Sequence, residues 1–86
     1  MEQSLGSRRR PFTRLQGQYL AFIALYTRLH QVPPAEADLQ RRFRVTAPAV
    51  HQMILALERN GLLERVPGEA RSLHVLVAKE ELPELE

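Results

Sequence analysis

A change of hydrophobic periodicity at Gly61 constrains the fold of this chain more than any other feature. Before Gly61, apolar residues recur at every third or fourth position, as they do along one face of an α-helix. After it, the run "RSLHVLV" places Leu73, Val75 and Val77 at every second position, which is typical of a strand with one buried face. Glycine also suits the left-handed conformation that commonly ends a helix. The chain is therefore expected to be helical before Gly61 and β-rich after it.

The first of three expected helices begins at Thr13, which stands three residues before Gln16 in the spacing of a capping box. It should end near Gln31, because the prolines that follow lack the N–H of a helix interior and disfavour helical geometry in the residue before them. Spacings of three and four place six apolar residues on one stripe: Leu15, Tyr19, Phe22, Ile23, Tyr26 and Leu29. This stripe is expected to face the core.

Two further helices are expected. Residues 35–43, "AEADLQRRF", form a short helix with acids at the positive end of the helix dipole and Arg41 and Arg42 at the negative end. Thr46 then provides an N-cap for a helix over residues 47–60. The helical period puts the core stripe of this third helix at Val50, Met53, Ile54 and Leu57, and its opposite face at Pro48, Gln52, Leu55 and Arg59.

Two β-rich runs, "LLERV" and "RSLHVLV", bracket the turn sequence "PGEA" and predict a hairpin. Three helices and a hairpin make a mainly α fold with a small β-hairpin, in the order of a winged helix-turn-helix. Residues 12–78 are expected to form this domain, between a flexible basic arm (1–11) and a flexible acidic tail (79–86). In such a fold the third helix, about 47–60, enters the major groove of DNA, and the wing, 67–71, contacts the adjacent backbone or minor groove.

Composition excludes several classes of protein. With 44% apolar and 26% charged residues, the chain is expected to be soluble, and no apolar run reaches the roughly 18 residues of a membrane span. The absence of cysteine excludes disulfides and thiol chemistry, and the absence of an apolar leader favours a cytoplasmic location. The three histidines are too scattered for a metal site, and no catalytic motif is present. We therefore expect no enzyme activity, no cofactor and no small-molecule effector.

Charge is unevenly distributed along the chain. Residues 8–71 hold eleven arginines against five acids, a net +6, whereas residues 72–86 carry a net −3. A basic segment of this kind favours a nucleic acid partner. Eleven of the twelve basic residues are Arg, whose planar guanidinium suits phosphate and base edges, although a genomic preference for Arg codons explains this bias equally well.

Four stretches, in their order and spacing, carry a resemblance to a known family: "FTRLQGQYLAFIALY", "VPPAEADLQRRF", "LALERNGLLERV" and "PGEARSLHV". From about Thr13 to Val77, the chain resembles the N-terminal DNA-binding domain of LexA-type repressors and, more loosely, MarR-type regulators. The resemblance implies binding of double-stranded DNA and a role as a transcriptional regulator or repressor.

The chain departs from this family at two places. Ala35 stands where a polar helix cap is usual, and Pro48, Ala49 and Val50 replace polar residues at the start of the third helix. The operator sequence of the family is therefore not carried over. Self-cleavage is not expected either, since the Ser-Lys peptidase domain of LexA has no counterpart in these 86 residues.

The opening of the third helix has no Lys or Arg, so base contacts are assigned there to uncharged residues and one histidine: Thr46, Pro48, Ala49, His51 and Gln52. Gln52 is the strongest candidate, because its amide can pair with N6 and N7 of adenine. Contacts to the DNA backbone are assigned to nine arginines: Arg8, Arg9, Arg10, Arg14, Arg41, Arg42, Arg44, Arg59 and Arg71. The N–H groups of the first helical turn are a further candidate phosphate site.

A protein-interaction or dimerisation module without sequence-specific DNA readout is the alternative, because Leu55 places an apolar side chain on the expected readout face. Leu20 and Leu25 lie off the centre of the first helical stripe and, with Arg14 and Arg28 on their flanks, mark a candidate homodimer surface. The acidic end "EELPELE" is a candidate to fold back on the arginines and compete with DNA, although plain disorder of this segment is the simpler interpretation.

Overall fold

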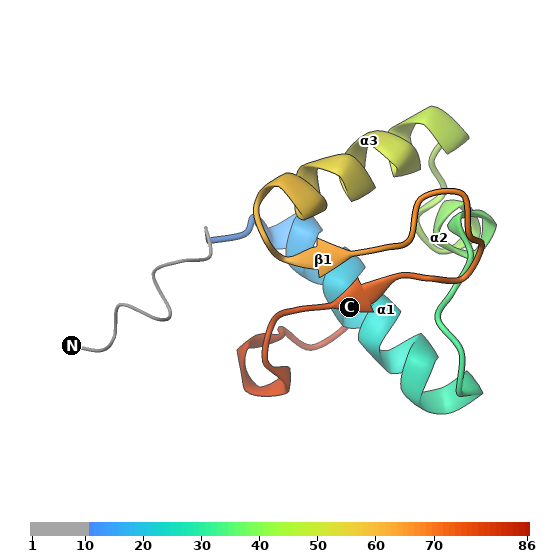
Figure 1. Ribbon diagram of the computed structural model, residues 1–86. Helices are drawn as coiled ribbons and strands as arrows, with labels where there is room; N and C mark the ends of the chain where they lie inside the picture. Colours follow the sequence, from blue (N-terminus) through green and yellow to red (C-terminus); the bar gives the residue numbers. More distant parts are fainter. Residues whose placement is uncertain (1–10) are drawn as a thin grey trace.

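The computed structural model describes residues 11–86 and shows three α-helices followed by a two-stranded hairpin (Figure 1). The elements are α1 (Arg14–His30), α2 (Glu36–Phe43), α3 (Ala47–Arg59), the antiparallel strands β1 (Leu63–Glu64) and β2 (His74–Val75), and a short 3-10 helix, η2 (Lys79–Glu81). The predicted winged helix-turn-helix order is confirmed. The basic arm predicted for residues 1–11 falls outside the described residues except for Pro11. No helix in the described part is long and apolar enough to cross a membrane.

Threonine caps begin two of the helices, as the sequence predicts. Thr13 Oγ1 accepts a hydrogen bond from the Gln16 N–H at 3.1 Å, and the Gln16 side chain accepts one from the Thr13 N–H at 3.0 Å. These two bonds complete the capping box of α1. Thr46 Oγ1 accepts from the Ala49 N–H at 3.2 Å at the start of α3. Both helices therefore begin where their caps place them.

Each helix is followed by a residue with positive φ. Gln31 follows α1 with φ 66°, Arg44 follows α2 with φ 55°, and Gly61 lies one residue beyond the C-cap of α3 with φ 75°. Gly61 was the one predicted from the sequence. The reversal at Arg44 leaves only residues 44–46 between α2 and α3, which is the short turn of a helix-turn-helix.

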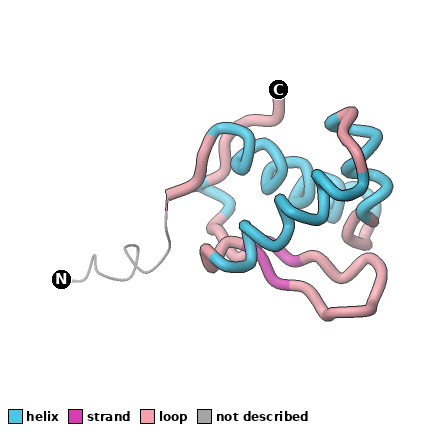
Figure 2. Tube along the Cα trace, turned by 90° about the horizontal axis from the view of Figure 1, so that it is seen from above, coloured by secondary structure: helices cyan, strands magenta, loops and turns pink. Residues whose placement is uncertain are grey.

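The core lies between the helices and the hairpin. In it, α2 packs against α3, α3 against β1, and α1 against β2. The buried apolar residues are Tyr19, Leu20, Ile23, Leu39, Val50, Ile54, Leu57, Leu62, Leu63, Leu73 and Val77. Tyr19 stacks on Phe43 with ring centroids 4.0 Å apart and so joins α1 to α2. Figure 2 shows the strands at one side of the helices, with the hairpin loop reaching the edge of the molecule.

The predicted core stripe of α1 is only partly correct. Leu15 and Leu29 belong to the predicted stripe, but they lie near the two ends of the helix and keep 52% and 66% of their surface exposed. Leu20, expected outside the stripe and on a homodimer surface, is fully buried in the core. Residues 17–21 are all buried, so a whole turn of α1 is enclosed rather than one stripe.

The acidic tail supplies part of that enclosure, which differs from the fraying expected for residues 79–86. Leu82 packs against the core, and Pro83 lies so close to Gly17 that a Cβ at this glycine would come within 3.1 Å of the proline ring. The buried side chain of Gln18 forms hydrogen bonds with the main chain at the end of the tail. The tail is thus a packed segment of the domain.

Candidate nucleic-acid interface

The residues predicted to read bases lie together on the exposed opening of α3. Their common feature is that the structure leaves all of them exposed: Thr46, Pro48, Ala49, His51 and Gln52. On the opposite face of the helix, Val50, Ile54 and Leu57 are fully buried, as the helical period predicts. Leu55, which the protein-interaction alternative requires as an exposed apolar residue, is half-buried. The geometry therefore presents a small-residue surface around Gln52.

The first turn of α3 offers fewer free N–H groups than expected. The Ala49 N–H is bound to the Thr46 side chain, and the Val50 N–H donates to the Thr46 carbonyl oxygen at 3.1 Å. Pro48 has no N–H at all. Within the described residues this leaves the Ala47 N–H as the free donor of the turn, so phosphate binding here has to depend mainly on side chains.

His51 and Gln52 differ in their surroundings. His51 Nδ1 lies 3.8 Å from the Glu36 carboxylate, a distance at which the two form an ion pair when the imidazole is protonated. This contact joins α3 to the first residue of α2. The Gln52 side chain makes no hydrogen bond within residues 11–86, so its amide is available to a ligand. Gln52 is therefore the freer of the two side chains.

The structure describes six of the nine arginines assigned to the DNA backbone, since Arg8, Arg9 and Arg10 lie outside the described residues. Arg44 in the turn before α3 and Arg59 at the end of α3 are exposed, and neither has a partner in the described part of the chain. The other four side chains are held by contacts within the protein: Arg14, Arg41, Arg42 and Arg71.

Arg71 anchors the hairpin loop to the helices. Its Nη1 lies 3.2 Å from the Tyr26 hydroxyl, 3.3 Å from the Pro33 carbonyl oxygen and 3.3 Å from Asp38 Oδ2. The hydrogen bond with Tyr26 raises the pKa of Arg71, and the Asp38 carboxylate acts in the same direction. One wing residue thus contacts α1, the loop after it and α2, and its main structural effect is to position the wing.

Asp38 is the acid on which these contacts converge. Its Oδ2 accepts a hydrogen bond from the Ala35 N–H at 2.8 Å, which supplies one half of a capping box, while the Ala35 side chain offers no acceptor for the other half. Its Oδ1 accepts from Arg41 Nη2 at 2.5 Å. The bond from Ala35 is the largest cause that lowers the pKa of Asp38, and the charges of Arg71 and Arg41 add to it. Asp38 is therefore held as a carboxylate that fixes both the start of α2 and the wing.

Ser72 closes the hairpin loop from inside. Its Oγ accepts from the Val66 N–H at 3.0 Å and lies 3.2 Å from the Val66 carbonyl oxygen and 3.0 Å from that of Glu69. The alternation of the strand places Ser72 on the outer face, yet it is only 7% exposed. Sequence reasoning missed this role, because a single hydroxyl bonding to a distant turn leaves no periodic signal.

A single tail residue, Glu86, engages two of the predicted DNA-binding arginines. Arg14 donates to Glu86 Oε2 from Nη2 at 2.6 Å and from Nε at 3.0 Å. Arg42 Nη2 donates to the main-chain oxygen of Glu86. The Arg42 guanidinium also lies 5.9 Å from the ring centroids of Phe22 and Phe43. These two arginines come from α1 and α2, and the tail brings them to one place.

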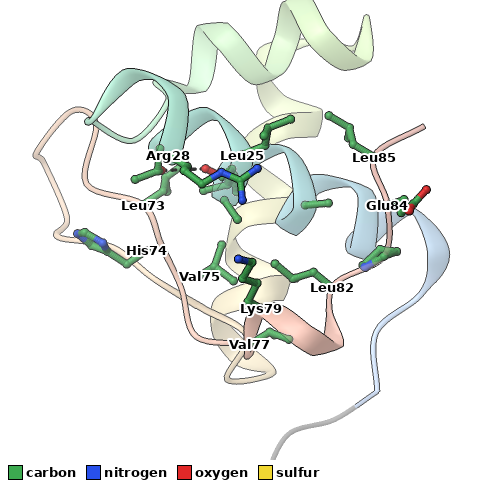
Figure 3. A pocket seen from close by; sticks show the side chains of 15 residues that line it. Leu25, Arg28, Leu73, His74, Val75, Val77, Lys79, Leu82, Glu84 and Leu85 are labelled. Carbon is green, nitrogen blue, oxygen red and sulfur yellow. Dashed lines mark hydrogen bonds between the residues drawn. The ribbon is translucent and has the colours of Figure 1, made fainter.

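A cleft of about 720 Å³ lies away from this surface, between α1, the second strand and the tail. Figure 3 shows Val75 and Val77 on the strand side of the cleft and Leu82 and Leu85 from the tail, with Arg28 and other polar side chains among them. None of its lining residues is a predicted DNA-contacting residue. The described residues contain no group of three or more potential metal-ligating side chains.

The helix-turn-helix turn, the hairpin wing and the exposed opening of α3 define the class of winged helix-turn-helix domains. Comparison with protein families gives the same result, since residues 9–72 match the LexA DNA binding domain. The chain therefore belongs to the LexA DNA-binding domain family, and the resemblance noted from the sequence is confirmed.

Several LexA repressors are relatives of this chain. The LexA repressor of Thermotoga petrophila is 35% identical over 63 residues, which is 73% of this chain and 32% of the relative. That of Thermotoga maritima is 33% identical over 63 residues, with the same two shares. That of Methylococcus capsulatus is 32% identical over 73 residues, 84% of this chain and 36% of the relative. The chain thus spans about a third of the length of the relatives it matches.

Proposed function

We propose that this domain binds double-stranded DNA in a sequence-dependent way, with α3 in the major groove and wing residues 67–71 on the adjacent backbone or minor groove. The observation that carries this proposal is the opening of α3. It is exposed, contains small side chains and has a free amide at Gln52, while arginines surround it. A helix that enters the major groove needs such a narrow surface with donors and acceptors near its N-terminus.

Base contacts come from the opening turns of α3. Gln52 pairs with N6 and N7 of an adenine, an interaction worth about 1 to 3 kcal/mol of discrimination against other bases. His51 donates to a guanine or to a phosphate oxygen. Thr46, Pro48 and Ala49 are small enough to let the helix approach closely, and the methyl groups of Thr46 and Ala49 suit contact with a thymine methyl.

Backbone contacts come first from Arg44 and Arg59. The 13 residues of α3 give a length of about 20 Å at the usual helical rise. The major groove is about 12 Å wide, so cations at the two ends of the helix suit the phosphates that border it. The arginines that are held within the protein contribute only where DNA displaces or shares their present partners.

The named relatives are repressors, and we propose that this chain serves as a transcriptional repressor or as the DNA-binding part of one. As a homodimer it would read two half-sites separated by about 34 Å, one turn of DNA. Leu20 cannot contribute to a dimer surface because it is fully buried, and Leu25 is half-buried in the wall of the cleft. The surface for a homodimer therefore has to lie elsewhere than at Leu20.

Selection of bound sequences from a random duplex library, followed by fluorescence anisotropy titration, tests this function. With about five to seven phosphate contacts, the logarithm of the affinity should fall with the logarithm of the salt concentration at a slope of roughly −5 to −6. Gln52→Ala should erase the preference at one base pair, about 1 to 3 kcal/mol, and leave binding to unrelated DNA unchanged. Absence of binding to any duplex at low salt would refute the proposal.

A further inference from the structure

The tail of the domain is seated in a site whose parts come from α1. Gly17 leaves room for Pro83, since a Cβ there would come within 3.1 Å of the proline ring. Next to it, Gln18 is only 7% exposed and points its amide at the tail. Leu82 packs against the core immediately before Pro83. The tail therefore fits a defined surface of α1.

The Gln18 side chain forms hydrogen bonds with the main chain of the tail rather than with its side chains. Its Nε2 donates to the Glu84 carbonyl oxygen at 2.9 Å, and its Oε1 accepts from the Glu86 N–H at 2.8 Å. A buried amide with both its groups bonded in this way holds an extended segment at a fixed position along the chain. In the free domain these main-chain bonds fix the position of Glu86 independently of the contacts of its side chain.

At this position the side-chain carboxylate of Glu86 accepts from Arg14, and the main-chain oxygen of Glu86 accepts from Arg42. Arg42 is the second-last residue of α2, directly before the turn that leads into α3. The Arg14 and Glu86 side chains are 80% and 56% exposed, so solvent screens their ion pair. Exposed ion pairs are weak, and a phosphate can therefore replace the carboxylate.

We propose that residues 82–86 form an acidic latch that competes with DNA phosphates for Arg14 and Arg42. The latch rests on the proposed DNA binding. In the free protein Gln18 holds the segment and Glu86 occupies both arginines. On DNA the segment leaves Gln18 and both arginines, and the two guanidinium groups bind phosphate oxygens. The acidic segment thus sets the affinity of the domain without touching the residues that read bases.

Two substitutions of equal charge test the latch in the full chain. Glu86→Gln removes the carboxylate from Arg14, whereas Glu84→Gln removes the same charge two residues away, where the side chain has no partner among the described residues. We expect Glu86→Gln to bind DNA roughly two- to five-fold more tightly than Glu84→Gln at low salt, the range of an exposed ion pair. The difference should shrink as salt is added. Equal affinities of the two variants would overturn the proposal.

A substitution that leaves the charge unchanged distinguishes the effect of releasing the latch on DNA affinity from the effect of the net charge. Gln18→Met keeps the size of the side chain and the charge of the protein but removes both bonds to the tail. It should tighten DNA binding in the same range as Glu86→Gln, with folding confirmed by circular dichroism. Weaker DNA binding by the folded Gln18→Met variant would show that the seated tail supports binding and would overturn the proposal.

Hydrogen exchange reports the latch directly. The Glu86 N–H, which is bound to Gln18 in the free domain, should exchange faster when saturating DNA is present. Unchanged or slower exchange would overturn the proposal. If no variant binds DNA, the proposed function fails and the latch with it. If all variants bind with equal affinity, the latch alone fails.

Discussion

The side chains at the opening of α3 and the arginines around it differ in how many contacts they make within the protein. Gln52 and its small neighbours are exposed and have few contacts within the protein, so they are available before DNA arrives. Of the six described arginines assigned to the DNA backbone, four are instead bound to acidic residues, main-chain oxygens or a hydroxyl group of the same chain. In the proposed mode of binding, base reading requires little change in the domain, whereas four of the six described backbone candidates have to exchange their partners.

This difference lowers the charge that the domain can use at first contact. Residues 8–71 hold eleven arginines, but Asp38 and Glu86 already bind four of them. Among the described residues, Arg44 and Arg59 are the backbone candidates without a partner. They border the exposed face of α3 at its two ends. A simple charge count thus overestimates the number of phosphate contacts that form without rearrangement.

The largest expected effect tests this division among the arginines. Arg44→Ala and Arg59→Ala should each weaken DNA binding about ten-fold in about 0.05 M salt, because each removes one phosphate contact and the counterion released with it. Together they should make the salt slope shallower by about 2. Arg41→Ala should weaken binding only a few-fold, since Arg41 is already paired with Asp38. Fluorescence anisotropy over a range of salt concentrations measures all three effects.

Arg28→Ala is the matched control for these variants. Arg28 is an exposed arginine whose side chain has no partner in the described residues, but it lines the cleft rather than the proposed DNA surface. Its replacement should change the affinity for DNA much less than that of Arg44 or Arg59. If Arg41→Ala weakens binding as much as Arg44→Ala, the distinction between held and free arginines is wrong.

A smaller effect is expected at the acid that holds the wing. Asp38→Asn keeps an acceptor for the Ala35 N–H but weakens the bonds from Arg41 and Arg71. The free energy of unfolding should fall by about 1 kcal/mol, the difference between a hydrogen bond to a charged group and one to a neutral group. Thermal and urea denaturation measure the loss. Glu64→Gln, an exposed acid on β1, is the control and should change stability by less than about 0.5 kcal/mol.

The Asp38 effect should also depend on pH. The pKa of Asp38 is lowered in the folded domain from an ordinary value of 3.8, so the carboxylate stabilises the fold above that value. This contribution is lost as the pH falls through the lowered folded-state pKa. Unfolding free energies of the wild type and Asp38→Asn should therefore differ at neutral pH and converge in acid. A difference that persists unchanged to the lowest pH would contradict the assigned role.

The sequence predicted best those features that depend on residues close together in the chain, such as helix caps and helix faces. The start of α3 follows from the Thr46 cap, and its buried and exposed faces follow from the helical period, so the candidate readout residues were placed correctly on the exposed face. The core stripe of α1 was less accurate. Leu20 is buried because it belongs to the central core, whereas Leu15 lies near the start of the helix, away from that core, and keeps 52% of its surface exposed.

Contacts between distant residues were the hardest to predict, and the sequence offered the fold-back of the acidic end on the arginines only as a candidate without naming a pair. Arg71 bonds to Asp38 across 33 residues, and Arg14 bonds to Glu86 across 72. Neither pair has a characteristic spacing, because the position of each partner depends on the folded core. A basic residue in the sequence shows its charge, but only the fold shows whether that charge is already bound within the protein.

The smallest expected effect concerns the backbone at Arg44, which adopts φ 55° without being a glycine. Left-handed geometry costs about 1 to 2 kcal/mol for such a residue, and glycine recovers most of this despite its greater freedom in the unfolded chain. Arg44→Gly should therefore stabilise the domain by about 0.5 to 1 kcal/mol in thermal denaturation and yet weaken DNA binding. Gln31→Gly relieves the same geometry at φ 66° after α1 and should stabilise the domain without changing its affinity for DNA. An Arg44→Gly variant with unchanged affinity would mean that this arginine occupies a strained position for a reason other than phosphate binding.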